Sequence, residues 1–242
     1  MEILKKMAQK AQANAAYEGV TVAFLGDSVT QGCFEVYKKL DGSIETVFDK
    51  QHAYTKLFAD MLSVLYPSVP VNIINAGISG DNAPGGAKRL QRDVLRHEPD
   101  LVIVCYGLND CGETVDAIAR YTTALADIFS HVKAAGCELI FMTPNMMNTC
   151  ISPFLQKDEL IVSIAKATAA KQVSGVFDAH IDAARSLCKE MNVPVCDCYA
   201  LWKQLEAGGV DTTELLSNKI NHPTREMNKL FAYELIKTIF TA

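Results

Sequence analysis

The segment Phe24-Leu25-Gly26-Asp27-Ser28-Val29-Thr30-Gln31-Gly32 is the part of the sequence most indicative of the fold class. The apolar run from Val20 to Leu25 predicts a buried strand, and Gly26 ends it. Ser28 follows in the turn that a crossover from strand to helix would need. Parallel α/β sheets place their chemistry here, at the carboxyl ends of strands. Ser28 is therefore a candidate nucleophile, although Asp27 and Ser28 would equally suit a helix N-cap without any chemistry.

The rest of the chain repeats this alternation of short apolar runs and segments with helical periodicity. Strands are expected at 20–25, 69–74, 101–106, 137–142 and 193–196. Helices are expected at 2–16, 54–66, 87–97, 115–134, 158–173, 177–191, 199–206 and 225–238. This order predicts a three-layer α/β/α sandwich with a five-stranded parallel sheet and right-handed crossovers. The expected strand order is flavodoxin-like, 2-1-3-4-5, within a single domain over residues 1–242.

Two segments lie outside the alternation. Residues 1–18 have helix-forming composition and are expected as an N-terminal helix on the outside of the sheet. The sequence leaves open whether this helix forms a subunit contact and hence whether the protein is a homo-oligomer. Residues 33–51 form a polar insert of irregular pattern with a turn signal at Asp41-Gly42. The insert is expected either as a lip over the site or as a solvent-exposed excursion.

Composition narrows the class of protein. The 242 residues are 49% hydrophobic and 21% charged, with a formal net charge of −5. Without a basic surplus, nucleic acid is not an expected partner. No apolar run reaches the roughly 18 residues of a membrane span, and no signal-type apolar core occurs, so a cytoplasmic protein without membrane insertion is expected.

The eight cysteines do not suggest a metal site. No CxxC pair occurs, and Cys196-Asp-Cys198 is a poor spacing for zinc. Several cysteines lie in apolar runs, where this residue serves as a small hydrophobe. Reduced thiols and no bound metal are therefore expected.

Polar side chains gather where the first three predicted strands end. Ser28 follows the first strand, Gly77 and Asp81 lie at the end of the second, and Asn109-Asp110 lie at the end of the third. A fourth polar stretch, Asn221-His222-Pro223, precedes the last helix. In a parallel sheet all four stretches can converge on one edge. Ester cleavage needs such a set, because the nucleophile must lose its proton to a base and the oxyanion must meet fixed donors.

The roles follow from these residue types. Ser28 Oγ would attack and His222 would accept its proton. The backbone N–H groups of Ser28 and Gly77, with the amide of Asn109, would bind the oxyanion, since a glycine lets the backbone approach closely. Acidic side chains are expected in support, as caps or braces of these loops: Asp27, Asp81 and Asp110.

The set resembles the SGNH hydrolases, also called the GDSL-like lipase/esterase family. The four family blocks occur in order as Gly26-Asp27-Ser28, Gly77 within Asn75-Ala-Gly, Gly107-Leu-Asn109-Asp110, and His222-Pro223. The resemblance spans residues 26 to 223. It implies Ser28 as nucleophile, His222 as base, Gly77 and Asn109 as oxyanion donors, and no cofactor, since Ser–His chemistry needs none.

One position departs from the family pattern. Lys219 stands three residues before His222, where the family usually has the aspartate that orients the imidazole. Asn218 could take that role if the loop carries one extra residue, and Asp211 could fold back. A backbone carbonyl could also accept the ring N–H. We favour the last option, which leaves a Ser–His dyad.

The sequence therefore predicts a serine esterase that hydrolyses a small-molecule carboxylic ester through an acyl-enzyme. Family habit and the polar insert favour short acyl groups, such as acetyl on a carbohydrate. One alternative is a lysophospholipase or thioesterase, if Met146, Met147 and Phe154 line a long channel. The other is a non-catalytic ligand-binding protein on the same fold, for which Lys219 is the support.

Overall fold

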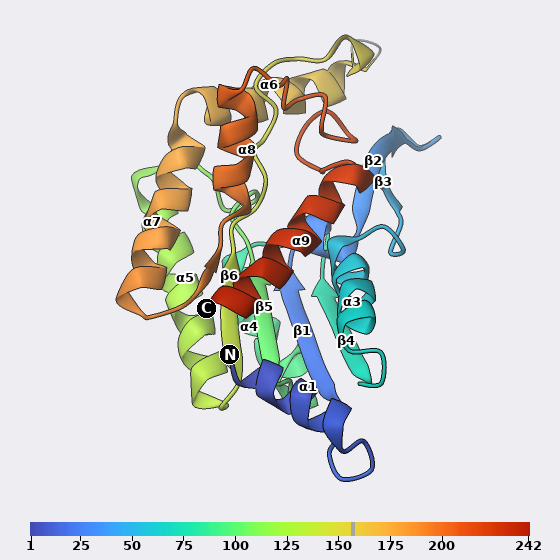
Figure 1. Ribbon diagram of the computed structural model, residues 1–242. Helices are drawn as coiled ribbons and strands as arrows, with labels where there is room; N and C mark the ends of the chain where they lie inside the picture. Colours follow the sequence, from blue (N-terminus) through green and yellow to red (C-terminus); the bar gives the residue numbers. More distant parts are fainter. Residues whose placement is uncertain (156–157) are drawn as a thin grey trace.

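A five-stranded parallel sheet forms the centre of the computed structural model, which describes residues 1–155 and 158–242 (Figure 1). Its strands are β1 (Val20–Gly26), β4 (Val71–Gly77), β5 (Leu101–Cys105), β6 (Glu138–Met142) and β7 (Val195–Cys196). They lie in the order β4-β1-β5-β6-β7, and every neighbouring pair is parallel. Counted along the chain within this sheet, the order is 2-1-3-4-5, so the predicted topology is confirmed.

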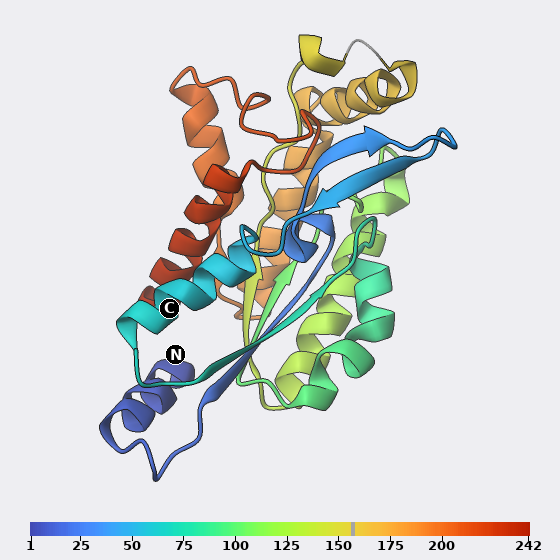
Figure 2. The ribbon, with the colours of Figure 1, turned by 90° about the vertical axis from the view of Figure 1, so that its right-hand side faces the viewer.

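Helices cover both faces of the sheet, which confirms the predicted three layers (Figures 1 and 2). On one face lie α1 (Glu2–Gln12), α3 (Tyr54–Leu65), α8 (Cys198–Ala207) and α9 (Arg225–Thr241). On the other lie α4 (Ala83–Asp93), α5 (Val115–Ala134) and α7 (Val176–Glu190). The remaining helix, α6 (Glu159–Val173), packs beyond the carboxyl edge, as does the single turn α2 (Ser28–Gln31). Short 3-10 turns occupy Leu95–His97 and Pro153–Leu155.

The alternation along β1 explains why two cores form. Val22 and Phe24 enter the core under α3 and α9, whereas Ala23 and Leu25 enter the core under α4 and α5. Phe24 is fully buried, and the edges of two other rings meet it with centroids 5.6 Å away. Because helices cover both faces, β1 and β5 consist of apolar runs rather than alternating residues.

The helices α1 and α4 differ from the predicted ranges by four residues, more than the other helices do. The first helix stops at Gln12, because Lys10 donates to the backbone carbonyls of Asn14 and Tyr17 and so draws the chain into a turn. The helix α4 begins at Ala83 rather than at residue 87, because the Asn82 side chain accepts the Gly85 N–H at 3.0 Å and caps the helix. None of the helices within residues 1–155 and 158–242 is long and apolar enough to span a bilayer.

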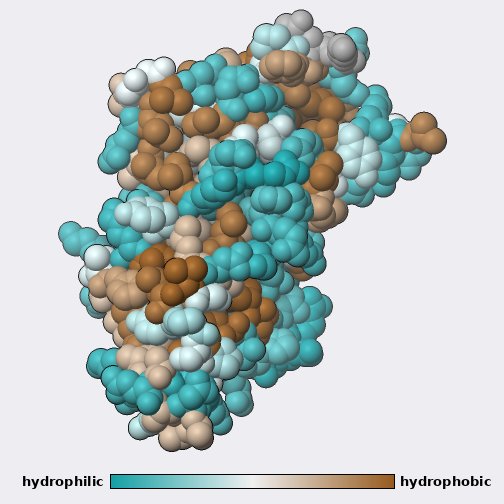
Figure 3. Space-filling model, turned by 45° about the vertical axis from the view of Figure 1, so that its right-hand side comes forward, coloured by the Kyte–Doolittle hydropathy of each residue, from teal (hydrophilic) through white to brown (hydrophobic). Residues whose placement is uncertain are grey.

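The insert at 33–51 is a β-hairpin, so the predicted irregular conformation was wrong. Its strands are β2 (Cys33–Lys38) and β3 (Ile44–Phe48), paired antiparallel around the predicted turn at Asp41-Gly42. The hairpin lies beyond the carboxyl edge of the main sheet (Figure 2) and projects from the body (Figure 3). Most of its side chains stay partly in water, which explains why no apolar pattern marked the strands.

Phe24 gives a test of this core. We expect Phe24→Ala to lower the free energy of unfolding by about 3–5 kcal/mol, because the substitution leaves a cavity beside the buried rings of Tyr54 and Phe58. Phe240→Ala is the control, since this residue of α9 is half-exposed and its loss should change stability by less than about 1 kcal/mol. Urea unfolding measures both, and equal effects would contradict the assigned core.

Candidate active site

Ser28 and His222 meet at the carboxyl edge of the sheet. Ser28 is the first residue of α2, directly after β1, and the Asp27 carboxylate caps this turn by accepting the Val29 N–H at 3.0 Å. His222 lies in the loop before α9. Its Nε2 is 3.0 Å from Ser28 Oγ, across 194 positions of sequence. Both side chains are buried, so the pair is shielded from bulk water.

The second ring nitrogen fixes the state of the imidazole. His222 Nδ1 lies 2.8 Å from the backbone carbonyl oxygen of Phe34. A carbonyl can only accept, so Nδ1 carries the proton and Nε2 turns its lone pair to Ser28. Burial lowers the pKa of His222, while the Phe34 carbonyl and the Glu35 charge oppose that shift. The imidazole is therefore neutral at pH 7, as a general base must be.

Neither side chain considered for the orienting role touches the ring. Asn218 Oδ1 accepts the N–H groups of Ile220, Asn221 and His222 at 2.9–3.0 Å and so holds the backbone of the loop. Asp211 is exposed and accepts the Thr213 N–H at 3.0 Å. The carbonyl of Phe34 is the group at Nδ1.

Of the two predicted oxyanion donors beyond Ser28, only Asn109 is free to serve. Asn109 is exposed, and its Nδ2 donates one hydrogen to the Asp81 carbonyl at 2.8 Å, which leaves the other hydrogen available. Gly77 is buried, and its N–H donates to Asn75 Oδ1 at 3.0 Å. A Cβ on Gly77 would come within 2.3 Å of the Gln31 N. Gly77 thus lets β4 pack against α2, and its predicted role as a donor does not fit.

Gly80 is a candidate donor in place of Gly77. It lies three residues further along the same loop, is exposed, and has φ of +79° with open space where a Cβ would lie. Within the part of the chain that the structure describes, its N–H has no acceptor. The signal that could have found it is the Ser79-Gly80-Asp81 turn, where a left-handed conformation favours glycine.

A buried arginine ties these loops together. Arg89 of α4 donates to the Gly26 carbonyl at 3.0 Å and to the Ala76 carbonyl at 2.6 Å, at the ends of β1 and β4. Its Nε forms an ion pair with Asp81 at 2.7 Å. Asp81 in turn holds Asn109 through its backbone carbonyl. Asp81 therefore supports the site as the partner of Arg89 rather than as a simple turn cap.

Two other carboxyl groups, those of Asp27 and Asp110, accept backbone N–H groups of the loops that form the site. One oxygen of Asp27 bonds the Val29 N–H, and one oxygen of Asp110 accepts the Ala83 N–H at 2.9 Å. Among the described residues, neither second oxygen has a partner. Burial, with repulsion between the carboxylates, raises the pKa of Asp27 to about 7 and that of Asp110 to about 6.

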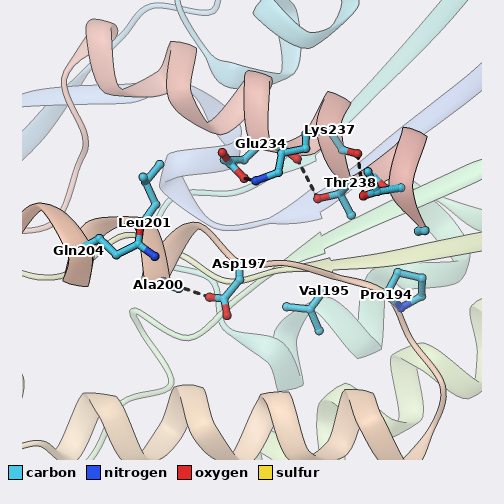
Figure 4. Close-up of a pocket in the computed structure, with 11 residues that line it drawn as sticks. Pro194, Val195, Asp197, Ala200, Leu201, Gln204, Glu234, Lys237 and Thr238 are labelled. Carbon is cyan, nitrogen blue, oxygen red and sulfur yellow. Dashed lines mark hydrogen bonds and ion pairs between the residues drawn. The ribbon is translucent and has the colours of Figure 1, made fainter.

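The remaining candidates lie elsewhere. Met146 and Met147 are buried in the core, whereas Phe154 is mostly exposed, so these three do not line one channel. The hollow shown in Figure 4, about 640 Å³ in volume, lies between the start of α8 and the far end of α9 and includes neither Ser28 nor His222. Over residues 1–155 and 158–242, no cluster of three His, Cys, Asp or Glu side chains could hold a metal ion.

An α/β/α sheet with a serine–histidine pair at its carboxyl edge defines a class of acyl-transferring proteins. The GDSL-like Lipase/Acylhydrolase family model matches residues 24–230, so this chain belongs to that family of ester hydrolases. The family resemblance of the four sequence blocks is confirmed.

Individual relatives are more distant. An acetylxylan esterase of Geobacillus stearothermophilus is 27% identical over 135 residues, which cover 52% of this chain and 60% of that protein. The alignment thus spans less than two thirds of that relative.

Solved structures share the fold. Axe2, an acetylxylan esterase from Geobacillus stearothermophilus, has a TM-score of 0.65 at 19% identity, over 92% of this chain and 94% of that one. A two-domain esterase active on acetylated mannans has a TM-score of 0.65 at 18% identity, over 99% of this chain and 52% of that one.

The raised pKa of Asp27 predicts a pH-dependent stability. Its pKa of about 7 in the folded protein lies above the ordinary 3.8, so the folded state binds this proton more tightly and stability falls as pH rises from about 4 to 7. Asparagine has no such proton. We expect Asp27→Asn to gain free energy of unfolding relative to the wild type across this interval, by up to about 4 kcal/mol, and no further above it.

Urea unfolding at pH 4 to 9 measures this gain. Asp60→Asn, which removes an exposed carboxylate of α3, is the control. A difference for Asp27→Asn that stays constant from pH 4 to 9 would show that Asp27 is not a buried group of raised pKa.

Proposed function

We propose that the protein is a serine esterase that hydrolyses carboxylic esters through an acyl-enzyme intermediate. The observation that carries the proposal is the contact of 3.0 Å between Ser28 Oγ and His222 Nε2, with the other ring nitrogen bound to the Phe34 carbonyl. A neutral imidazole held in this tautomer can remove the serine proton. A neighbour of the same fold supports the role of serine, since a serine-to-alanine variant of Axe2 is described as a catalytic mutant.

The reaction follows from the groups in place. Ser28 Oγ attacks the ester carbonyl carbon while its proton moves to His222 Nε2. The N–H groups of Ser28 and Gly80 and the amide of Asn109 stabilise the oxyanion, and each donor contributes about 3 kcal/mol. The intermediate collapses, and the leaving alcohol takes the proton from Nε2. Water then attacks the acyl-serine with the same base, which releases the acid and restores Ser28.

Short acyl groups on carbohydrates are the proposed substrates. One relative is an acetylxylan esterase, and a structural neighbour is an esterase active on acetylated mannans. The burial of Met146 and Met147 in the core gives no support to a long acyl channel built from these residues. The non-catalytic alternative rested on Lys219, and the Phe34 carbonyl supplies the ring contact that an aspartate at that position would make.

Assay of p-nitrophenyl acetate, butyrate and octanoate, with acetylated xylo-oligosaccharides, tests the proposal. We expect the acetyl ester to be the best of the series, and Ser28→Ala to lower kcat about 10⁴-fold or more. The acid limb of kcat/KM should have its midpoint below 6.5, because burial lowers the pKa of His222. Ser63→Ala, on the exposed part of α3, should leave turnover unchanged.

Fluorophosphonate labelling separates the alternatives in the same experiment. Labelling of Ser28 is expected only if its hydroxyl is activated. A peak at eight carbons would favour the lysophospholipase or thioesterase reading. If the protein shows no turnover and Ser28 is not labelled, the remaining interpretation is a non-catalytic binding protein.

Asp211 tests whether the site is a dyad. Asp211→Asn keeps an oxygen for the Thr213 N–H, and Asp211 makes no contact with the ring of His222. We therefore expect most of the turnover to remain, as measured by kcat on p-nitrophenyl acetate. A thousandfold loss, about 4 kcal/mol, would show that Asp211 reaches the imidazole during catalysis.

A further inference from the structure

The carbonyl that holds His222 is available because the hairpin contains a β-bulge. The ladder pairs Cys33 with Phe48 and then Val36 with Thr46, so β2 carries one residue more than β3 between these pairs. A bulge takes backbone groups out of the ladder and aims them elsewhere. Here the Phe34 carbonyl leaves the hairpin and accepts the His222 Nδ1–H.

A single arginine connects the bulge to the segment that carries His222. Arg225 is the first residue of α9, three positions after His222. Its Nη1 and Nη2 lie 2.6 and 3.2 Å from the two oxygens of Glu35, a bidentate pair. Its Nε lies 2.8 Å from Asp49 Oδ2, and its guanidinium lies over the Phe34 ring, 4.3 Å from the centroid.

These contacts fix both strands of the hairpin at its base. Glu35 lies in the bulge of β2, and Asp49 follows β3 directly. The Asp49 N–H also donates to the Gly32 carbonyl at 2.8 Å, which closes the base. One side chain therefore sets where the Phe34 carbonyl stands relative to the imidazole. Lysine could not replace it fully, because an ammonium cannot form the bidentate pair and the stack together.

We propose that Arg225 is the positioning residue of the site. It holds the bulge of β2 so that the Phe34 carbonyl keeps the proton of His222 on Nδ1, the task that a carboxylate three residues before the histidine would otherwise perform. The catalytic consequence rests on the proposed esterase function, whereas the effect on the tautomer does not.

The first test compares Arg225→Met with a matched control, Arg185→Met. Arg185 of α7 also pairs with two carboxylates and lies over an aromatic ring, and its side chain is 31% exposed against 29% for Arg225. We expect Arg225→Met to lower kcat about 10- to 100-fold with little change in KM, as for a misplaced catalytic group. Arg225→Lys should recover part of the loss, and Arg185→Met should keep the wild-type kcat.

The second test reads the tautomer without any substrate. In protein labelled with ¹⁵N-histidine, the His222 signals, assigned by their absence in His222→Gln, should show a protonated, slowly exchanging Nδ1 in the wild type and in Arg185→Met. Arg225→Met should lose that signal or show the proton on Nε2. If Arg225→Met does not fold, the double variant Glu35→Gln with Asp49→Asn removes both ion pairs with little change in volume and should give the same result.

The outcomes separate the two proposals. An unchanged Nδ1 signal in Arg225→Met, or an unchanged kcat in an active enzyme, would overturn the role of Arg225. If the tautomer depends on Arg225 but the protein cleaves no ester, the positioning role of Arg225 is supported and the proposed esterase function is refuted.

Discussion

The hydrogen bond from His222 Nδ1 to the Phe34 carbonyl is the interaction on which the site depends. An imidazole can accept a proton at Nε2 only if the other nitrogen already carries one. In a buried position this choice must be imposed by a neighbour, because little water is present to exchange the two forms. A carbonyl imposes the tautomer as well as a carboxylate does, but it stabilises the imidazolium less. Burial lowers the pKa of His222, and the nearby Glu35 charge opposes that fall and so supplies part of the missing stabilisation.

Two arginines hold different parts of the site in position. Arg89 is buried beneath the sheet edge and joins the ends of β1 and β4 to Asp81, which in turn holds Asn109. Arg225 lies on the other side and joins the hairpin to the helix after His222. The nucleophile and the oxyanion donors thus depend on one network, and the base depends on the other. Arg89 donates to backbone carbonyls and a carboxylate, whereas Arg225 donates to two carboxylates, and both patterns suit the planar fork of arginine.

The fold could be predicted because its signals are local and strong. The run from Leu101 to Cys105 is apolar throughout, as a strand covered on both faces must be. Ser28 and His222 could be found because few residue types perform their chemistry. The hairpin escaped prediction, since only Cys33, Phe34 and Thr46 of its strands are buried. The sequence also could not show that the Phe34 carbonyl accepts the His222 Nδ1–H, because every residue has the same backbone carbonyl. The choice between Gly77 and Gly80 depended on burial, which two glycines in one loop do not reveal.

The surplus residue in β2 limits how this chain can change in length. At its turn the hairpin could gain or lose residues on both strands together and keep its register. Loss of one residue between Cys33 and Val36 would instead restore a regular ladder. A shift of one position turns every following side chain to the opposite face, and the carbonyl that faces His222 would return to pairing within the hairpin. The more regular protein would be the one without a correctly held base.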